Sequence, residues 1–117
     1  MKKKVLVIDD ELDLCALIRL VFMRENFSVD CAYNLQEASA KLPGHPDIVL
    51  LDNNLPDGLG IEYYGTHAEA FDDCYIVMMS ADGSEKTKAM ARKAGINEFI
   101  QKPFTIQKMK DIINKTR

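Results

Sequence analysis

The sequence has few cysteines, no long apolar run and little net charge, and each shortage argues against a class of protein. Its three cysteines, Cys15, Cys31 and Cys74, are odd in number, widely spaced and outside any CxxC pair. We therefore expect free thiols in a reducing cytoplasm rather than a disulfide framework. No run approaches the roughly 20 apolar residues of a membrane span, and no apolar signal-peptide core follows the lysines at 2–4. A net charge of −3 argues against a nucleic-acid-binding or membrane-binding surface.

The length and composition fit one globular domain. The chain has 117 residues, of which 47% are hydrophobic and 28% charged, as in ordinary globular proteins. We expect a single domain over residues 1–117.

Four short apolar runs each end on residues suited to phosphate chemistry. Unbroken runs rich in valine, isoleucine and leucine are typical of strands in a parallel sheet buried on both faces. In open sheets of this kind, ligands bind beyond the carboxyl ends of the strands. We therefore expect three carboxylates, a hydroxyl and an ammonium at one edge of the sheet. The runs and the residues that follow them are Val5–Ile8 with Asp9 and Asp10, Ile48–Leu51 with Asp52, Ile76–Met79 with Ser80, and Phe99–Gln101 with Lys102.

Helical patterns separate these strands, and residues 28–33 alternate between apolar and polar as a further strand does. We expect the element order (βα)5 with right-handed crossovers. Residues 53–60 are the longest predicted loop. A short helix begins at Asn34, because Asn34 and Glu37 have the spacing of a capping box. The other helices are predicted over residues 11–25, 61–71, 85–94 and 106–116.

The three aspartates predicted at the sheet edge, Asp9, Asp10 and Asp52, have no basic neighbour in the sequence. Two like charges about 5 Å apart repel by roughly 3 kcal/mol at an effective dielectric constant near 20, so we expect a cation among them. All-oxygen ligation favours Mg²⁺ or Mn²⁺ over zinc. An aspartate beside such an ion can attack phosphorus and form an acyl phosphate. Lys102 would then neutralise one phosphoryl oxygen, and Ser80 would donate a hydrogen bond to another.

The order and spacing of these residues resemble the receiver domain of two-component response regulators. The resemblance covers essentially the whole chain and implies a flavodoxin-like (βα)5 doubly wound parallel sheet with strand order 2-1-3-4-5. The motifs that carry it are Val7–Glu11, the segment Leu51–Gly60, Ser80-Ala81 and Lys102-Pro103-Phe104.

This resemblance implies which residues accept the phosphoryl group and bind the metal. Asp52 would accept it from a phosphohistidine on a sensor histidine kinase or a phosphotransfer protein. Asp10 would bind Mg²⁺ directly, Asp9 largely through water, and Asp52 with one carboxylate oxygen. The backbone carbonyl of Asn54 would complete the protein ligands.

The resemblance also implies a switch. Ser80 and Lys102 would hold the phosphoryl group, and Phe99 matches the aromatic residue that moves inward when the hydroxyl residue moves toward the phosphate. Serine stands where threonine is more frequent in the family, and phenylalanine where tyrosine is, so no phenol hydroxyl reports the switch. The alternative is that Phe99 is a strand residue that packs on the last helix.

The resemblance implies that the protein is a switch controlled by phosphorylation rather than an enzyme. Its only catalysis would be the transfer of the phosphoryl group to itself and the hydrolysis of that group. Asn54 and Asp82 flank the path of an attacking water and are small and polar, which predicts relatively fast hydrolysis. Output would pass to an output domain or effector protein through the 84–94 helix, the 97–101 strand and the 105–116 helix. We also expect a cis Lys102-Pro103 bond, which would aim the lysine into the site.

Two alternatives use related chemistry or a related fold. A haloacid-dehalogenase-type, Mg²⁺-dependent phosphatase would need an acid two residues after its nucleophile, where this chain has Asn54. A flavin-binding flavodoxin would need a hydroxyl- and glycine-rich loop after the first strand, where this chain has Asp9, Asp10 and Glu11. Whether an output domain follows Arg117 stays open.

Overall fold

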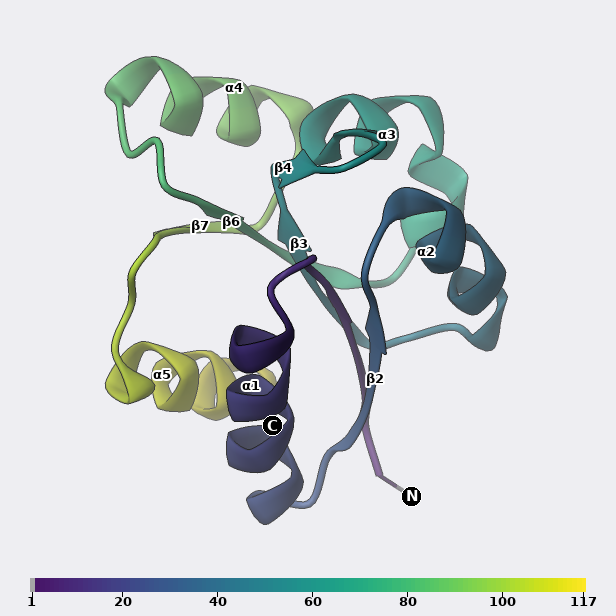
Figure 1. Cartoon of the computed structure of the whole chain (residues 1–117), viewed down its shortest axis with the longest axis vertical. Coiled ribbons are helices and arrows are strands. Elements are labelled where there is room, and N and C mark those ends of the chain that lie inside the picture. The colour runs from purple at the N-terminus through teal and green to yellow at the C-terminus, as the bar shows by residue number, and fades with distance from the viewer. Residues whose placement is uncertain (1) are drawn as a thin grey trace.

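A five-stranded parallel sheet lies between two layers of helices in the computed structural model, which describes residues 2–117 (Figure 1). The strands lie in the order β2-β1-β3-β6-β7. This is the predicted 2-1-3-4-5 order, because the short strands β4 and β5 belong to a separate hairpin. The strands of the main sheet are β1 (Lys4–Ile8), β2 (Ser28–Ala32), β3 (Ile48–Asp52), β6 (Tyr75–Ser80) and β7 (Glu98–Gln101).

The helices begin where the sequence supplies capping side chains. Asn34, Ser84 and Thr105 each accept a hydrogen bond from the backbone N–H three residues later, which replaces a missing intrahelical partner. Gly95 ends α4 with a positive φ of 96°, as a C-cap glycine does. The helices are α1 (Leu12–Arg24), α2 (Leu35–Lys41), α3 (Gly60–Thr66), α4 (Glu85–Ala94) and α5 (Ile106–Thr116).

Each face of the sheet has its own hydrophobic core. One core joins the sheet to α1 and α5 through residues such as Phe22 and Met109. The other joins the opposite face to α2, α3 and α4 through residues such as Ala38, Tyr63 and Ala91. Because both faces are covered, every residue of β3 is buried, which explains its unbroken apolar sequence.

Two sequence-based boundaries were wrong. The helix predicted over 61–71 is α3 followed by a separate 3₁₀ turn, Ala68–Phe71. α3 ends at Thr66, whose hydroxyl donates to the carbonyls of Glu62 and Tyr63. The loop predicted over 53–60 contains an antiparallel hairpin of β4 (Asn54–Leu55) and β5 (Gly58–Leu59).

Three other expectations are confirmed. The Lys102-Pro103 bond is cis. All three cysteines are free thiols, and Cys15 and Cys31 are buried. Within residues 2–117, no helix combines the length and the hydropathy that crossing a membrane requires.

Candidate functional site

The strand register brings the predicted site residues to one edge of the sheet. Ile8 pairs with Leu51, Asp52 with Met79 and Ser80 with Gln101. The residues that end these strands therefore lie side by side at the carboxyl edge, although they are far apart in the sequence.

Three carboxylates form the centre of this site. Asp9 is fully buried and Asp52 is 4% exposed, whereas Asp10 is exposed. One oxygen from each lies within 4.8 Å of the others, and no other such group of potential metal ligands occurs in residues 2–117. Buried carboxylates this close together need a compensating positive charge. Their hard oxygen ligands fit Mg²⁺ or Mn²⁺.

Lys102 supplies part of that charge. Its Nζ lies 2.7 Å from Asp9 Oδ2, 3.4 Å from Asp52 Oδ1 and 3.6 Å from Glu11 Oε1. Burial acts to lower the pKa of Lys102, but the hydrogen bond to Asp9 and the surrounding carboxylates outweigh it, so the pKa is raised. The lysine is therefore a permanent cation at this site.

The pKa of Asp52 is raised to about 6, from an ordinary value of 3.8. Burial is the largest cause and the negative charge of Asp9 is the next, while Lys102 opposes both. One ammonium thus does not fully compensate the buried carboxylates. Above pH 6, Asp52 is nonetheless mostly an anion.

The hydroxyl of Ser80 lies at the end of β6 and is fully buried. Its Oγ accepts a hydrogen bond of 3.1 Å from the backbone N–H of Asp82. The Asp82 carboxylate faces α4, where it accepts hydrogen bonds from the Thr87 hydroxyl (2.7 Å) and the Ser84 N–H (3.0 Å). These bonds lower the pKa of Asp82 and tie the end of β6 to the start of α4.

The loop after Asp52 is held by residues to which the sequence analysis gave no site role. Gly60 passes so close to Asp52 that a Cβ there would lie 2.4 Å from the Asp52 carbonyl oxygen. The side chain of Asn53 accepts a hydrogen bond from Ile61 N–H. Asp57 accepts backbone hydrogen bonds from Leu35 (2.9 Å) and the next residue (3.1 Å), so the hairpin is anchored to the start of α2. These contacts fix the backbone around Asn54.

Phe99 is half-buried and packs against the core on the α2, α3 and α4 side of the sheet. The alternative in which it packs on the last helix, α5, is therefore wrong. Glu11 was also missed as a neighbour of Lys102, although it directly follows the two aspartates.

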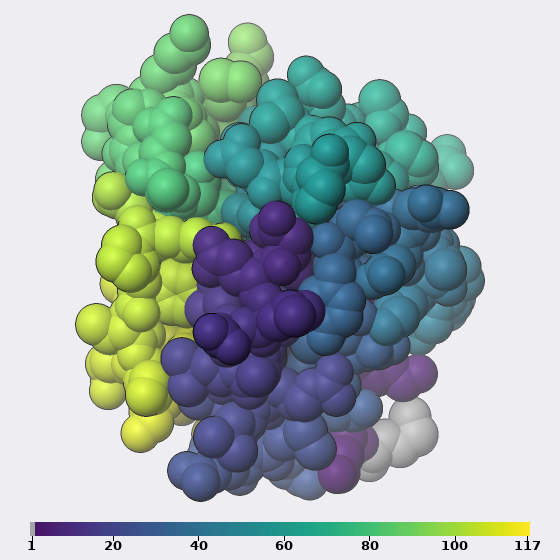
Figure 2. All heavy atoms as spheres, in the orientation of Figure 1, coloured from purple at the N-terminus to yellow at the C-terminus, as the bar shows by residue number. Residues whose placement is uncertain are grey.

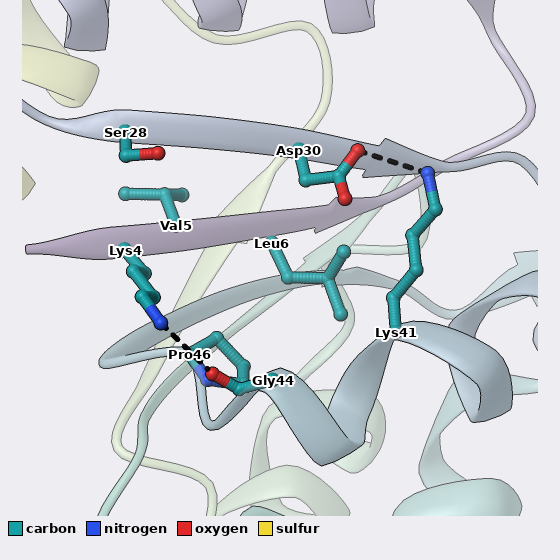
Figure 3. A pocket seen from close by; sticks show the side chains of 8 residues that line it. All are labelled: Lys4, Val5, Leu6, Ser28, Asp30, Lys41, Gly44 and Pro46. Atoms are coloured by element: carbon teal, nitrogen blue, oxygen red, sulfur yellow. Dashed lines mark hydrogen bonds and ion pairs between the residues drawn. The ribbon is translucent and has the colours of Figure 1, made fainter.

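A second hollow, at the β2 edge of the sheet, lacks comparable chemistry. It has a volume of about 220 Å³ and lies between β1, β2 and the segment after α2 (Figure 3). Its charged groups already have protein partners: Lys41 pairs with Asp30 at 2.9 Å, and Lys4 donates to the Gly44 carbonyl at 3.3 Å. The carboxylate cluster therefore remains the candidate site.

Comparison with known proteins points to one family. The family model of the response regulator receiver domain matches residues 5–114. The transcriptional regulatory protein ResD of Bacillus subtilis is 38% identical over 103 residues, which cover 87% of this chain and 42% of ResD. The response regulator protein PilR of Pseudomonas aeruginosa is 30% identical over 113 residues, covering 96% of this chain and 25% of PilR. The chain thus spans less than half the length of these relatives.

Solved structures agree on the fold. The chemotaxis response regulator CheY4 of Vibrio cholerae superimposes with a TM-score of 0.89 at 21% identity, with 100% of each chain covered. A two-component response regulator from Clostridium difficile gives a TM-score of 0.91 at 24% identity, covering 98% of this chain and 95% of the other.

Proposed function

Since the chain belongs to the response regulator receiver domain family, we propose that Asp52 is the residue on which it is phosphorylated. The observation that carries this proposal is the placement of Asp52, 3.4 Å from the Lys102 ammonium and within 4.8 Å of two further carboxylates. The donor would be a phosphohistidine on a sensor histidine kinase or phosphotransfer protein in the cytoplasm.

The residues of the chain account for the transfer. A carboxylate oxygen of Asp52 forms a bond to phosphorus while the bond from phosphorus to the donor nitrogen breaks, and the leaving imidazole keeps the electron pair. Lys102 neutralises one phosphoryl oxygen, and the Ser80 hydroxyl donates a hydrogen bond to another. In the present structure the Ser80 Oγ only accepts a hydrogen bond, from the Asp82 N–H, so its own hydrogen is available for the phosphoryl group.

Asp9, Asp10, Asp52 and the backbone carbonyl of Asn54 would hold a Mg²⁺ ion, for which Mn²⁺ can substitute. The bound ion supplies positive charge that stabilises the phosphoryl oxygens. The three carboxylates fit this role because they are hard oxygen ligands with only one nearby ammonium.

Hydrolysis and switching follow from the same site. Water forms a bond to phosphorus while the bond from phosphorus to the Asp52 oxygen breaks, which releases phosphate and restores the carboxylate. The small polar side chains of Asn54 and Asp82 leave room for this water. Movement of Ser80 toward the phosphoryl group, with Phe99 moving inward, would change the face formed by α4, β7 and α5 and so pass the signal to an output domain or effector. The phosphatase alternative lacks its second acid and receives no support from the relatives above.

Phosphorylation with a small donor tests the assignment. Incubation with phosphoramidate or acetyl phosphate and Mg²⁺ should add one phosphoryl group, measured by intact mass. The Asp52→Asn variant should take up none. Asp72→Asn, the same change at an exposed residue that precedes β6, should label normally. Equal labelling of the Asp52→Asn variant would exclude Asp52 as the acceptor.

A further inference from the structure

Two of the three cysteines form a buried pair beside the candidate site. Cys15 is in α1 and Cys31 is in the neighbouring strand β2 (Figure 1), and their side chains hydrogen-bond to each other. The backbone of Asp9 contacts both elements. Its carbonyl accepts a hydrogen bond from the Cys15 thiol at 3.3 Å, and its N–H donates to the carbonyl of Ala32, which follows Cys31, at 3.0 Å. The pair is therefore one hydrogen bond away from the carboxylate cluster.

A guanidinium lies beside the two thiols. Arg19 is one helical turn after Cys15 on α1, and its side chain hydrogen-bonds to Cys31. Across residues 2–117, no carboxylate forms an ion pair with Arg19. The hydrogen bonds from Cys15 and Arg19 lower the pKa of Cys31 to about 6, although burial opposes them. Reactive cysteines are found beside such cations, because the thiolate is the nucleophile.

The third cysteine has a different environment. Cys74 directly precedes β6, and its thiol donates to the Pro46 carbonyl at 2.9 Å. Burial and the nearby carboxylates raise the pKa of Cys74 to about 11. Its hydrogen-bond partner is thus a carbonyl rather than a second thiol, and its charge environment disfavours the thiolate. Cys74 is therefore a control within the same chain.

We propose that Cys15 and Cys31 are a redox pair that a peroxide converts to a disulfide, and that the oxidised chain is phosphorylated more slowly. The disulfide itself depends only on the contact between the two thiols. Its effect on phosphorylation rests on the proposed function, because it concerns Asp52.

The oxidation proceeds in two steps. The Cys31 thiolate attacks one oxygen of the peroxide, so that a sulfur–oxygen bond forms, the oxygen–oxygen bond breaks and hydroxide leaves. The Cys15 sulfur then attacks the Cys31 sulfur, which forms the disulfide and breaks the sulfur–oxygen bond, and water leaves with the Cys15 proton. The two sulfurs together lose two electrons, which the peroxide gains. Exchange with a dithiol reductant restores both thiols.

Burial limits which reagents reach the pair. Cys15 is 1% exposed and Cys31 is 2% exposed, and Figure 2 shows the purple surface of α1 covering this side of the molecule. The start of α1 lacks a side-chain cap, because Glu11 makes no capping hydrogen bond. An uncapped helix end opens more readily than a helix interior. Such opening admits a small peroxide and disfavours a bulky thiol reagent.

Oxidation acts on the carboxylate cluster through Asp9. A disulfide has no S–H group, so the Asp9 carbonyl loses its hydrogen bond from Cys15. The new bond also ties α1 to β2, and the segment that joins Asp9 to α1 carries Asp10. Both aspartates are proposed ligands of the cation. We therefore expect the oxidised chain to hold the cation less well and to accept the phosphoryl group more slowly.

Intact mass and peptide mapping without reductant test the disulfide. Stoichiometric hydrogen peroxide should remove the mass of two hydrogen atoms and link Cys15 to Cys31, and dithiothreitol should reverse the change. Cys74→Ala should behave like the natural chain, whereas Cys31→Ala should form no internal disulfide. A link that includes Cys74, or the absence of any link, would overturn the proposal.

A second pair of variants tests the guanidinium and leaves both thiols in place. Arg19→Gln should slow disulfide formation about threefold or more, because Cys31 loses the cation that favours its thiolate. Arg24→Gln is the matched control, since it makes the same change at an exposed residue at the other end of α1. Equal rates in these two variants would contradict the role given to Arg19.

Labelling with phosphoramidate and Mg²⁺ tests the effect on the site. The oxidised chain should label about threefold more slowly than the reduced chain, as expected for the loss of one weak hydrogen bond, and dithiothreitol should restore the rate. A disulfide that leaves labelling unchanged would refute the link to the site. Normal labelling of a chain that forms no disulfide refutes the redox pair alone. A reduced chain that forms the disulfide but never labels refutes the proposed acceptor instead.

Discussion

Replacing Asp52 with asparagine should stabilise the metal-free protein at neutral pH. The ionised carboxylate is 4% exposed, and its pKa is about 6 in the folded chain against an ordinary 3.8. That difference corresponds to about 3 kcal/mol of destabilisation once the group is fully ionised. Asparagine keeps the size and removes the charge, but it also loses attraction to Lys102. We therefore expect a net gain on the order of 1–3 kcal/mol.

The dependence of the stability difference on pH distinguishes this electrostatic effect from an effect of packing. Between pH 3.8 and about 6, the folded state holds the Asp52 proton more tightly than the unfolded state does. Stability therefore falls as the pH rises through this window and then levels off. Asparagine has no such proton, so its advantage should be full above pH 6 and should disappear near pH 4.

Denaturant unfolding of both proteins in EDTA, at pH 7.5 and pH 4, measures this difference. Subtracting the two curves at each pH cancels the titration of the groups that do not interact with Asp52. Asp57→Asn is the matched control, because the pKa of Asp57 is shifted in the opposite direction. Hydrogen bonds from the N–H groups of Leu35 and Gln36 lower it, so replacing Asp57 should not stabilise the fold. If Asp52→Asn lowers the midpoint at pH 7.5, or if its gain is the same at pH 4, then burial and the charge of Asp9 do not destabilise the ionised Asp52 carboxylate as reasoned.

Three further predictions concern the metal ligands and the loop around them. Excess Mg²⁺ should raise the unfolding midpoint of the natural chain more than that of Asp52→Asn, because binding stabilises the folded state by mass action; an equal rise would argue against a shared site. Asn54→Leu should lengthen the lifetime of the phosphoryl group, followed by intact mass over time, because a bulky apolar side chain blocks water; an unchanged lifetime would make that position irrelevant. Gly60→Ala should lower the unfolding midpoint and reduce the response to Mg²⁺, since its Cβ would lie 2.4 Å from the Asp52 carbonyl oxygen. Its control, Gly65→Ala, has nothing within 4 Å and should stabilise α3 by up to about 1 kcal/mol.

The main sheet and the site could be predicted because their signals are local and periodic. The runs that end at Asp9, Asp52 and Ser80 are apolar throughout, and parallel strands buried on both faces require such runs. Once the strands are parallel, the residues after them must share one edge. Helix starts were equally predictable, because Ser84 and Thr105 cap through their own side chains.

The contacts that support the loop depend on tertiary structure and have no local signal. Asp57 binds the start of α2, 22 residues away in the sequence, so its neighbours indicate only a turn. The need for Gly60 comes from the Asp52 carbonyl, which lies against it only after β3 and α3 have packed. The face on which Phe99 packs depends in the same way on the register of β7, which a four-residue strand does not reveal alone.

The charges at the site explain why phosphorylation and cation binding should depend on each other. Lys102 lies closer to Asp9 than to Asp52, 2.7 Å against 3.4 Å, so its ammonium chiefly compensates the fully buried carboxylate. One positive charge against Asp9, Asp10 and Asp52 leaves an excess of negative charge, to which Glu11 adds. A phosphoryl donor is itself anionic and is repelled by such a site. The site therefore lacks the positive charge that the proposed reaction needs. A divalent cation held by these carboxylates would leave Lys102 free to contact the phosphoryl group.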